Sequence, residues 1–275
     1  MKTITLLILL LNYFQASHSS SRSSSRPTIL IHGIASSREQ LEPFAEHLRD
    51  KDHIIYNVEI GNGFLDSIFM NMNTQCELFN IEIEKLNISN EKINIIGFSQ
   101  GGLTSRCYVE KYSHLTKNVS KLITIGTPHS GIYYEKLPYD GLMKYEYIKD
   151  PFLYEKYLEK NDYLVYLNNE KNHENSKIYK NNMKTLDLFF NIYSKSDEVI
   201  VPYQSSFFEF YNIEKAKHSG FLEVQGFNES HQYTCDLIGL KYLITNNKYT
   251  KHNIECSHDR FKESEELIEF INQIL

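Results

Sequence analysis

The sequence predicts an α/β fold with a mostly parallel central sheet that is flanked by helices. From residue 28 onward, short apolar runs of strand type alternate with longer stretches of helical spacing, which is the pattern of βαβ units. Several of the runs are apolar at consecutive positions, as strands covered on both faces are. The chain has 275 residues, of which 41% are hydrophobic, and this suits one domain with a single core.

The predicted strands each end in a turn that contains Gly, Ser or Asp. Helical stretches lie between them, and the last of these repeats its apolar residues on one face. The predicted strands are residues 28–31, 54–60, 93–98, 122–125, 186–193 and, late in the chain, 252–256. The predicted helices are residues 38–49, 69–86, 103–112 and 261–275.

Residues 133–182 interrupt this alternation. The segment is rich in Tyr, Leu and Phe and contains no convincing strand. Because a structureless loop of this length is rare between two sheet strands, we predict helices that form a lid over one end of the sheet.

The N-terminus has the features of a signal peptide. Lys2 precedes an apolar run over residues 4–11, and small residues follow at Ala16, Ser17 and Ser19. The apolar run is shorter than the roughly 20 residues that span a bilayer, which disfavours a stable membrane anchor. We predict a signal peptide at 1–19, a flexible leader at 20–26 and a domain at 27–275, in a secretory-pathway protein that is lysosomal or secreted.

Export would place the four cysteines in an oxidising compartment, where an even number commonly forms disulfides. Four cysteines allow three pairings. We favour Cys76 with Cys107 and Cys235 with Cys256, because those segments are neighbours in the predicted fold. The alternative is four buried thiols.

Three sequons, at Asn87, Asn118 and Asn228, agree with passage through a secretory route. The net charge of −6 and the lack of a basic stretch argue against nucleic acid as a partner. The sequence shows no Cys/His cluster of metal-binding type, and no metal or other cofactor is predicted. It gives no signal for the oligomeric state.

The segment Gly97-Phe98-Ser99-Gln100-Gly101 directly follows a predicted strand and directly precedes a predicted helix. This is the setting of a nucleophile elbow, a sharp turn that holds a serine in a strained backbone conformation. Side chains two residues away on either side would collide in such a turn, so Gly97 and Gly101 fit it. We predict Ser99 as a catalytic nucleophile on an α/β-hydrolase fold.

A serine hydroxyl needs a base, and the base needs an orienting acid. Asp197 follows the predicted strand 186–193 and is the predicted acid, with Glu198 as its nearest competitor. His258 lies between the last predicted strand and the last helix and is the predicted base. The alternative histidines are His32, His129 and His231.

The negative charge of a tetrahedral intermediate needs two backbone N–H donors. Gln100, the residue after the nucleophile, is one predicted donor. The other is Ile34, in the His32-Gly33-Ile34 loop after the first strand.

Together these residues resemble the palmitoyl-protein thioesterase family, over nearly the whole chain from Thr28. The segments after Ser196 and Asp236 are the more specific part, because hydrolases at large do not share them. The resemblance rests on Ile31-His32-Gly33, Gly97-Phe98-Ser99-Gln100-Gly101-Gly102, residues 196–202 continuing into 205–211, residues 236–241, Cys256-Ser257-His258 and the lid's Lys149-Asp150-Pro151.

The resemblance implies a Ser99–His258–Asp197 triad, oxyanion donors at Ile34 and Gln100, and hydrolysis of long-chain acyl thioesters in S-acylated proteins or small acyl thiols. Two features depart from the family: Ala35 stands where Gly is often found, and residues 127–131 are closer to general lipases. A lipase or carboxylester esterase is therefore one alternative, and an inactive hydrolase-like binding protein is another. Phe207, Phe208 and Leu164 are expected to line the acyl groove.

Overall fold

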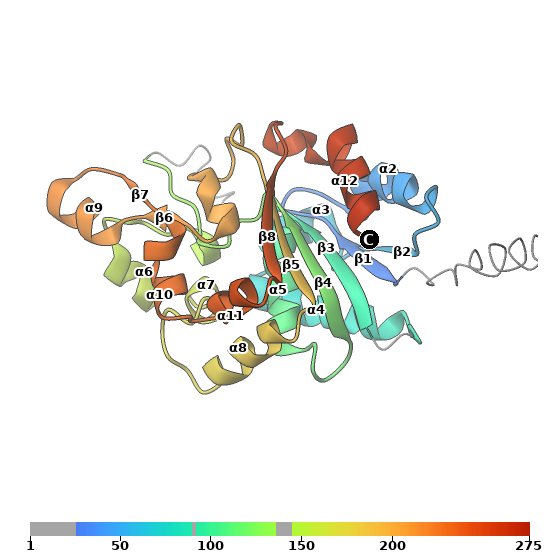
Figure 1. The fold of residues 1–275 in the computed structure, drawn as a ribbon, viewed down its shortest axis with the longest axis horizontal. Coiled ribbons are helices and arrows are strands. Elements are labelled where there is room, and N and C mark those ends of the chain that lie inside the picture. Colours follow the sequence, from blue (N-terminus) through green and yellow to red (C-terminus); the bar gives the residue numbers. More distant parts are fainter. Residues whose placement is uncertain (1–25, 90–91, 136–144) are drawn as a thin grey trace, which may run out of the picture.

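The protein is described here by a computed structural model that covers residues 26–89, 92–135 and 145–275. Its centre is a six-stranded sheet in which every pair of neighbouring strands is parallel, in the order β2-β1-β3-β4-β5-β8 (Figure 1). The predicted α/β-hydrolase fold with a mostly parallel sheet is confirmed. The strands are β1 Thr28–Ile31, β2 Ile55–Val58, β3 Lys92–Phe98, β4 Asn118–Ile125, β5 Leu188–Tyr193 and β8 Tyr249–Asn253. The predicted signal peptide and residues 20–25 of the predicted leader lie outside the described residues.

Helices cover both faces of the sheet because successive strand residues point to opposite sides. Ile29 and Ile95 pack into the cluster under α4, α5, α8 and α11, whereas Leu30 and Ile96 pack into the cluster under α2 and α12. The helices of the first face are α4 Met72–Lys85, α5 Gln100–Lys111, α8 Ser176–Lys184 and α11 Leu240–Thr245, and those of the second are α2 Arg38–Arg49 and α12 Glu265–Ile274.

Two predicted elements were wrong in their bounds for identifiable reasons. The last strand is β8 at Tyr249–Asn253, not residues 252–256, because β8 is a half-buried edge strand whose polar residues give no apolar run. The predicted helix 69–86 is divided into α3 Phe64–Phe69 and α4, since Met70 is extended and Asn71 caps α4 by accepting from the Thr74 N–H at 2.8 Å.

Short elements between β4 and β8 lie together at one side of the sheet (Figure 1). Tyr163 and Leu164, at the start of α7, are buried against Leu103 and Cys107 of α5, which attaches this group to the main domain. We call the group the cap. It consists of α6 Tyr154–Lys160, α7 Leu164–Leu167, β6 Phe210–Tyr211, α9 Ile213–Ser219, β7 Val224–Gln225 and α10 His231–Thr234. Of the predicted lid range 133–182, α6 and α7 belong to the cap, and residues 136–144 lie outside the described residues. The cap also includes β6 to α10, beyond that range, and the lid role stays a prediction.

No helix among the described residues is both long enough and apolar enough to cross a membrane.

The cysteines form one disulfide instead of the two predicted. Cys76 of α4 is bonded to Cys107 of α5, and both are fully buried. Among the described residues, Cys235 and Cys256 are unpaired, so the second predicted disulfide is wrong. Cys256 packs against the α2 and α12 side of the sheet, whereas the segment after Cys235 packs on the opposite face through Ile238. The sheet therefore lies between the two thiols.

A charged pair is buried on the inner side of α5. Arg106 Nε lies 3.5 Å from Glu110 Oε1, and both side chains are fully buried. Arg106 also donates to Asn168 of the cap at 2.7 Å. Burial raises the pKa of Glu110 to about 8, although the neighbouring Arg106 and Lys111 act in the opposite direction.

Cys107→Ser should lower the free energy of unfolding by about 3–4 kcal/mol, because a loop with a 31-residue separation is no longer closed in the unfolded chain. Urea unfolding of the oxidised protein measures this value. Cys235→Ser is the matched control and should change little, because Cys235 is exposed and unpaired. Peptide mapping that found Cys235 bonded to Cys256 would contradict the assignment.

Glu110 contributes more to the stability of the fold in acid than at mildly alkaline pH. Its folded pKa lies above the unfolded value of 4.5, so its contribution to stability is full below pH 4.5 and is lost as pH rises to about 8. Urea unfolding across this range should show that loss in the wild type and a flatter profile in Glu110→Gln. Equal slopes in the two proteins would count against the shifted pKa.

Candidate active site

Ser99 occupies a strained turn between β3 and α5. Its backbone has φ 51° and ψ −122°, a conformation that residues with a Cβ seldom adopt. The Ser99 N–H donates to the Ile125 carbonyl at the end of β4 at 2.7 Å, which fixes the turn against the neighbouring strand. The hydroxyl therefore stands at the carboxyl edge of the sheet.

The turn is possible because two glycines allow backbone to touch backbone. A Cβ on Gly97 would lie 2.6 Å from the Gly101 carbonyl oxygen, and one on Gly101 would lie 2.3 Å from the His32 carbonyl oxygen. Real Cβ atoms do not approach so closely, so the first turn of α5 can rest against the β1 end only with glycine at both positions.

The three predicted triad residues lie in one hydrogen-bonded chain. The Ser99 hydroxyl donates to His258 Nε2 at 3.0 Å, and His258 Nδ1–H donates to Asp197 Oδ2 at 2.8 Å. Asp197 is buried, and its Oδ1 accepts the N–H groups of Val199 and Ile200, both at 2.9 Å. These donors hold the carboxylate in place.

The competing residues are placed elsewhere. Glu198 is exposed, and the carboxylate bonded to His258 is that of Asp197. His129 is fully buried, with its Nε2 2.8 Å from Thr124 Oγ1, and burial holds the pKa of its ring well below 6.5. His231 is exposed on the cap, and His32 lies behind the loop after β1. Among the described histidines, His258 is the one bonded to Ser99.

The two predicted oxyanion donors flank the nucleophile. Gln100 is the first residue of α5, so its N–H has no acceptor within the helix. Ile34 lies in the loop after β1, and Gly33 beside it backs onto Ser99, where a Cβ would be 2.9 Å from the Ser99 Cβ. Ala35 has φ 49° and thus adopts the left-handed conformation for which glycine is favoured.

A pocket of about 390 Å³ opens in front of Ser99 and His258; we call it the Ser99 pocket. Its inner wall is apolar and its rim carries Ser36, Gln40, Asp259 and Lys262. The apolar wall consists of Ile34, Ala35, Leu41, Phe98, Ile125, Val199 and Phe261. Phe207, Phe208 and Leu164, expected to line an acyl groove, are buried and do not border this pocket. Phe207 packs against Tyr193 of β5, and Phe208 borders another pocket, of about 430 Å³.

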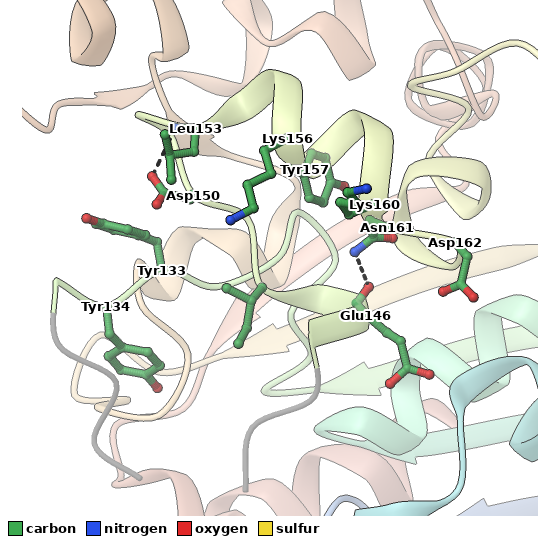
Figure 2. Close-up of a pocket in the computed structure, with 11 residues that line it drawn as sticks. Tyr133, Tyr134, Glu146, Asp150, Leu153, Lys156, Tyr157, Lys160, Asn161 and Asp162 are labelled. Carbon is green, nitrogen blue, oxygen red and sulfur yellow. Dashed lines mark hydrogen bonds between the residues drawn. The ribbon is translucent and has the colours of Figure 1, made fainter. Parts of the chain in front are cut away.

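A second pocket of about 310 Å³ lies in the cap; we call it the cap pocket (Figure 2). Tyr133, Tyr134 and Tyr157 face it together with Leu153 of the loop before α6, and charged side chains surround its opening. The Tyr134 hydroxyl donates to the Val199 carbonyl oxygen, and Val199 also borders the Ser99 pocket. This hydrogen bond links a residue of the cap pocket, Tyr134, to a residue of the Ser99 pocket, Val199.

Two buried residues support the site without any signal in the sequence. Gln75 of α4 accepts from Gln100 Nε2 at 3.1 Å and donates to carbonyl groups of α3 and Met70. The Tyr147 hydroxyl donates to Gln100 Oε1 at 3.1 Å. The Gln100 side chain thus ties the nucleophile turn to α4 and to the turn that ends at Tyr147. Only the fold brings these positions together.

No three His, Cys, Asp or Glu side chains within the described ranges are placed to share a metal ion.

The fold and the position of Ser99 define an α/β hydrolase. The protein resembles Aspergillus fumigatus lipase B, with a TM-score of 0.55, 14% identity, and coverage of 88% of this chain and 50% of that one. It also resembles a bromoperoxidase from Bacillus anthracis, with a TM-score of 0.51, 14% identity and 90% of each chain covered. At this level of identity the likeness concerns the fold alone.

The sequence comparison is more specific. A family model described as palmitoyl protein thioesterase matches residues 27–258. Palmitoyl-protein thioesterase 3 of Dictyostelium discoideum is 34% identical over 86% of this chain and 86% of its own. The lysosomal thioesterase PPT2 homolog of Drosophila melanogaster is 26% identical, over 79% of this chain and 80% of its own. The chain belongs to the palmitoyl-protein thioesterase family and is a hydrolase.

Gly101→Ala should lower kcat by about 100-fold, the order of losing one oxyanion donor, because the new Cβ must displace the His32 carbonyl and the adjoining Ile34 N–H. It should also lower the free energy of unfolding by about 1–3 kcal/mol. Gly226→Ala is the matched control, since a Cβ there would meet nothing within 4 Å. Wild-type turnover by Gly101→Ala would contradict the predicted role of this contact.

Proposed function

We propose that the protein is a serine thioesterase that works through an acyl-enzyme. Ser99 Oγ attacks the thioester carbonyl carbon while His258 Nε2 takes the hydroxyl proton and then passes it to the leaving thiolate. Water, deprotonated by the same ring, then attacks the acyl-enzyme and releases the fatty acid and Ser99. The observation that carries this proposal is the Ser99–His258–Asp197 hydrogen-bonded chain at 3.0 and 2.8 Å.

The N–H groups of Ile34 and Gln100 stabilise the oxyanion in this mechanism. Donors fixed before the reaction need no reorganisation when charge develops on the carbonyl oxygen. Asp197 keeps the Nδ1–H tautomer of His258 and stabilises the imidazolium that forms. Its two backbone donors support the same role, because they keep the carboxylate oriented.

The substrates we propose are long-chain acyl thioesters, in S-acylated proteins or in small thiols. Family membership supports the thioester, and the apolar wall of the Ser99 pocket supports the acyl chain. Each buried methylene contributes about 0.8 kcal/mol, so a long chain could gain most of its binding energy from such a wall. We further propose that the chain passes Val199 and Tyr134 toward the cap pocket (Figure 2).

We also propose a lysosomal or secreted location. Relatives of this chain are named lysosomal thioesterases, and the buried disulfide suits an oxidising compartment. Asn87, Asn118 and Asn228 are all exposed, which supports the proposed glycosylation at these positions.

Ser99→Ala should abolish hydrolysis without a change in the unfolding midpoint, because it removes a single hydroxyl. Asp197→Asn should lower kcat by about 10⁴-fold, the loss expected when the base has the wrong tautomer. Glu198→Gln is the matched control beside it and should retain wild-type kcat, because Glu198 is exposed. Steady-state turnover of a palmitoyl thioester measures all three, and activity in Ser99→Ala would sink the mechanism.

Matched palmitoyl thioester and oxyester substrates, extended to shorter acyl chains, test the substrate class. We expect kcat/KM to favour the thioester and to fall as the chain shortens. A strong oxyester preference would replace this proposal with a lipase or esterase. A protein that neither hydrolyses these substrates nor reacts at Ser99 with a fluorophosphonate would be a hydrolase-like binding protein.

A further inference from the structure

A buried histidine and a glutamate hold the loop that carries Ile34. His32 directly follows β1 and is 5% exposed. Its Nδ1–H donates to the Gly33 carbonyl oxygen at 2.8 Å, and its Nε2–H donates to Glu59 Oε1, just beyond β2. The other oxygen of Glu59 accepts the N–H of Arg38, the first residue of α2, at 2.8 Å. One carboxylate therefore joins the ends of β1, β2 and α2.

The bond to the Gly33 carbonyl sets the direction of the Ile34 N–H. Among the described residues, the one cis peptide bond is Val201-Pro202, so the peptide between Gly33 and Ile34 is trans. In a trans peptide the C=O and the following N–H point to opposite sides of one plane. Because His32 holds the carbonyl on its own side, the Ile34 N–H points away from His32. Ile34 N makes no hydrogen bond to any described residue, and Ile34 borders the Ser99 pocket.

The partners of the ring require both of its nitrogens to carry hydrogen. A carbonyl oxygen and an ionised carboxylate can only accept. Burial raises the pKa of Glu59, but the hydrogen bonds from His32 and from the Arg38 N–H outweigh it and leave that pKa below 4.5. Glu59 therefore offers the His32 ring an ionised acceptor, and the bond between them is charge-assisted.

We propose that His32 and Glu59 are positioning residues for the oxyanion hole: Glu59 fixes the His32 ring, and His32 Nδ1–H turns the Gly33–Ile34 peptide so that its N–H faces the reacting carbonyl oxygen. This inference rests on the proposed function of Ser99. Neither residue touches the substrate, so each acts on the rate through the Ile34 N–H.

Two substitutions of His32 separate positioning from packing. The side-chain nitrogen of Asn can occupy the place of Nδ1, and that of Gln the place of Nε2. His32→Gln loses the donor to Gly33 and should lower kcat by about 10- to 100-fold, with KM changed by less than about twofold. His32→Asn keeps that donor and should recover most of kcat. Turnover of a soluble octanoyl thioester, together with thermal unfolding, supplies these values.

Glu59→Gln should lower kcat with little change in KM, because the ring loses its charge-assisted partner. Glu42→Gln is the matched control: Glu42 accepts from Asn57 at 2.7 Å and pairs with Arg49, and neither partner lies in the loop. It should leave kcat unchanged. Equal kcat in wild type and His32→Gln would overturn the inference. An equal loss of kcat in both His32 variants, with higher KM and lower unfolding midpoints, would also overturn it.

The fluorophosphonate reaction distinguishes a failure of the proposed function from a failure of the positioning role alone. A wild-type protein that resists the reagent and does not hydrolyse the thioester would refute the proposed function itself. A wild-type protein that reacts, beside a His32→Gln variant that reacts equally fast, would refute only the positioning role.

Discussion

The site depends on one steric constraint, the contact between the first turn of α5 and the end of β1. Gly101 lies so close to the His32 carbonyl that a Cβ would be 2.3 Å from its oxygen. This contact brings the nucleophile turn and the loop of Ile34 together before any side chain is considered. Because both loops leave the carboxyl edge of a parallel sheet, they need little additional structure to form one site.

The carboxylates near the site and the carboxylate of Glu110 have different surroundings. In the proposed mechanism, the carboxylates of Asp197 and Glu59 each receive a backbone N–H and an imidazole, so both are held in a fixed orientation. Beneath the cap, Glu110 has no hydrogen-bond donor for either oxygen and its pKa is raised by burial. The first arrangement orients groups near the reaction, whereas the second contributes stability that is lost as pH rises.

The local part of this architecture could be predicted from the sequence. Consecutive apolar residues gave five of the strands, and the elbow glycines and the strand ends located Ser99, Asp197 and His258 at one edge. Long-range features carried no local pattern. The half-buried polar strand β8 was misplaced, and Cys235 was paired with Cys256 although they pack toward opposite faces of the sheet. The roles of Gln75 and Glu59 arise from contacts between segments that are distant along the chain.

The cap adds what the sheet alone lacks. In the proposed function, the triad at the rim of the sheet binds the thioester carbonyl, and the acyl chain extends from the apolar wall of the Ser99 pocket toward the cap pocket. Val199 lies at the connection between the two pockets. It belongs to the loop that holds Asp197, it borders the Ser99 pocket, and its carbonyl receives the hydroxyl of Tyr134 in the wall of the cap pocket. In the proposed function, this loop orients the acid and links the walls of the two pockets, so a change in the cap that moves Val199 is expected to alter chain-length preference and catalysis together.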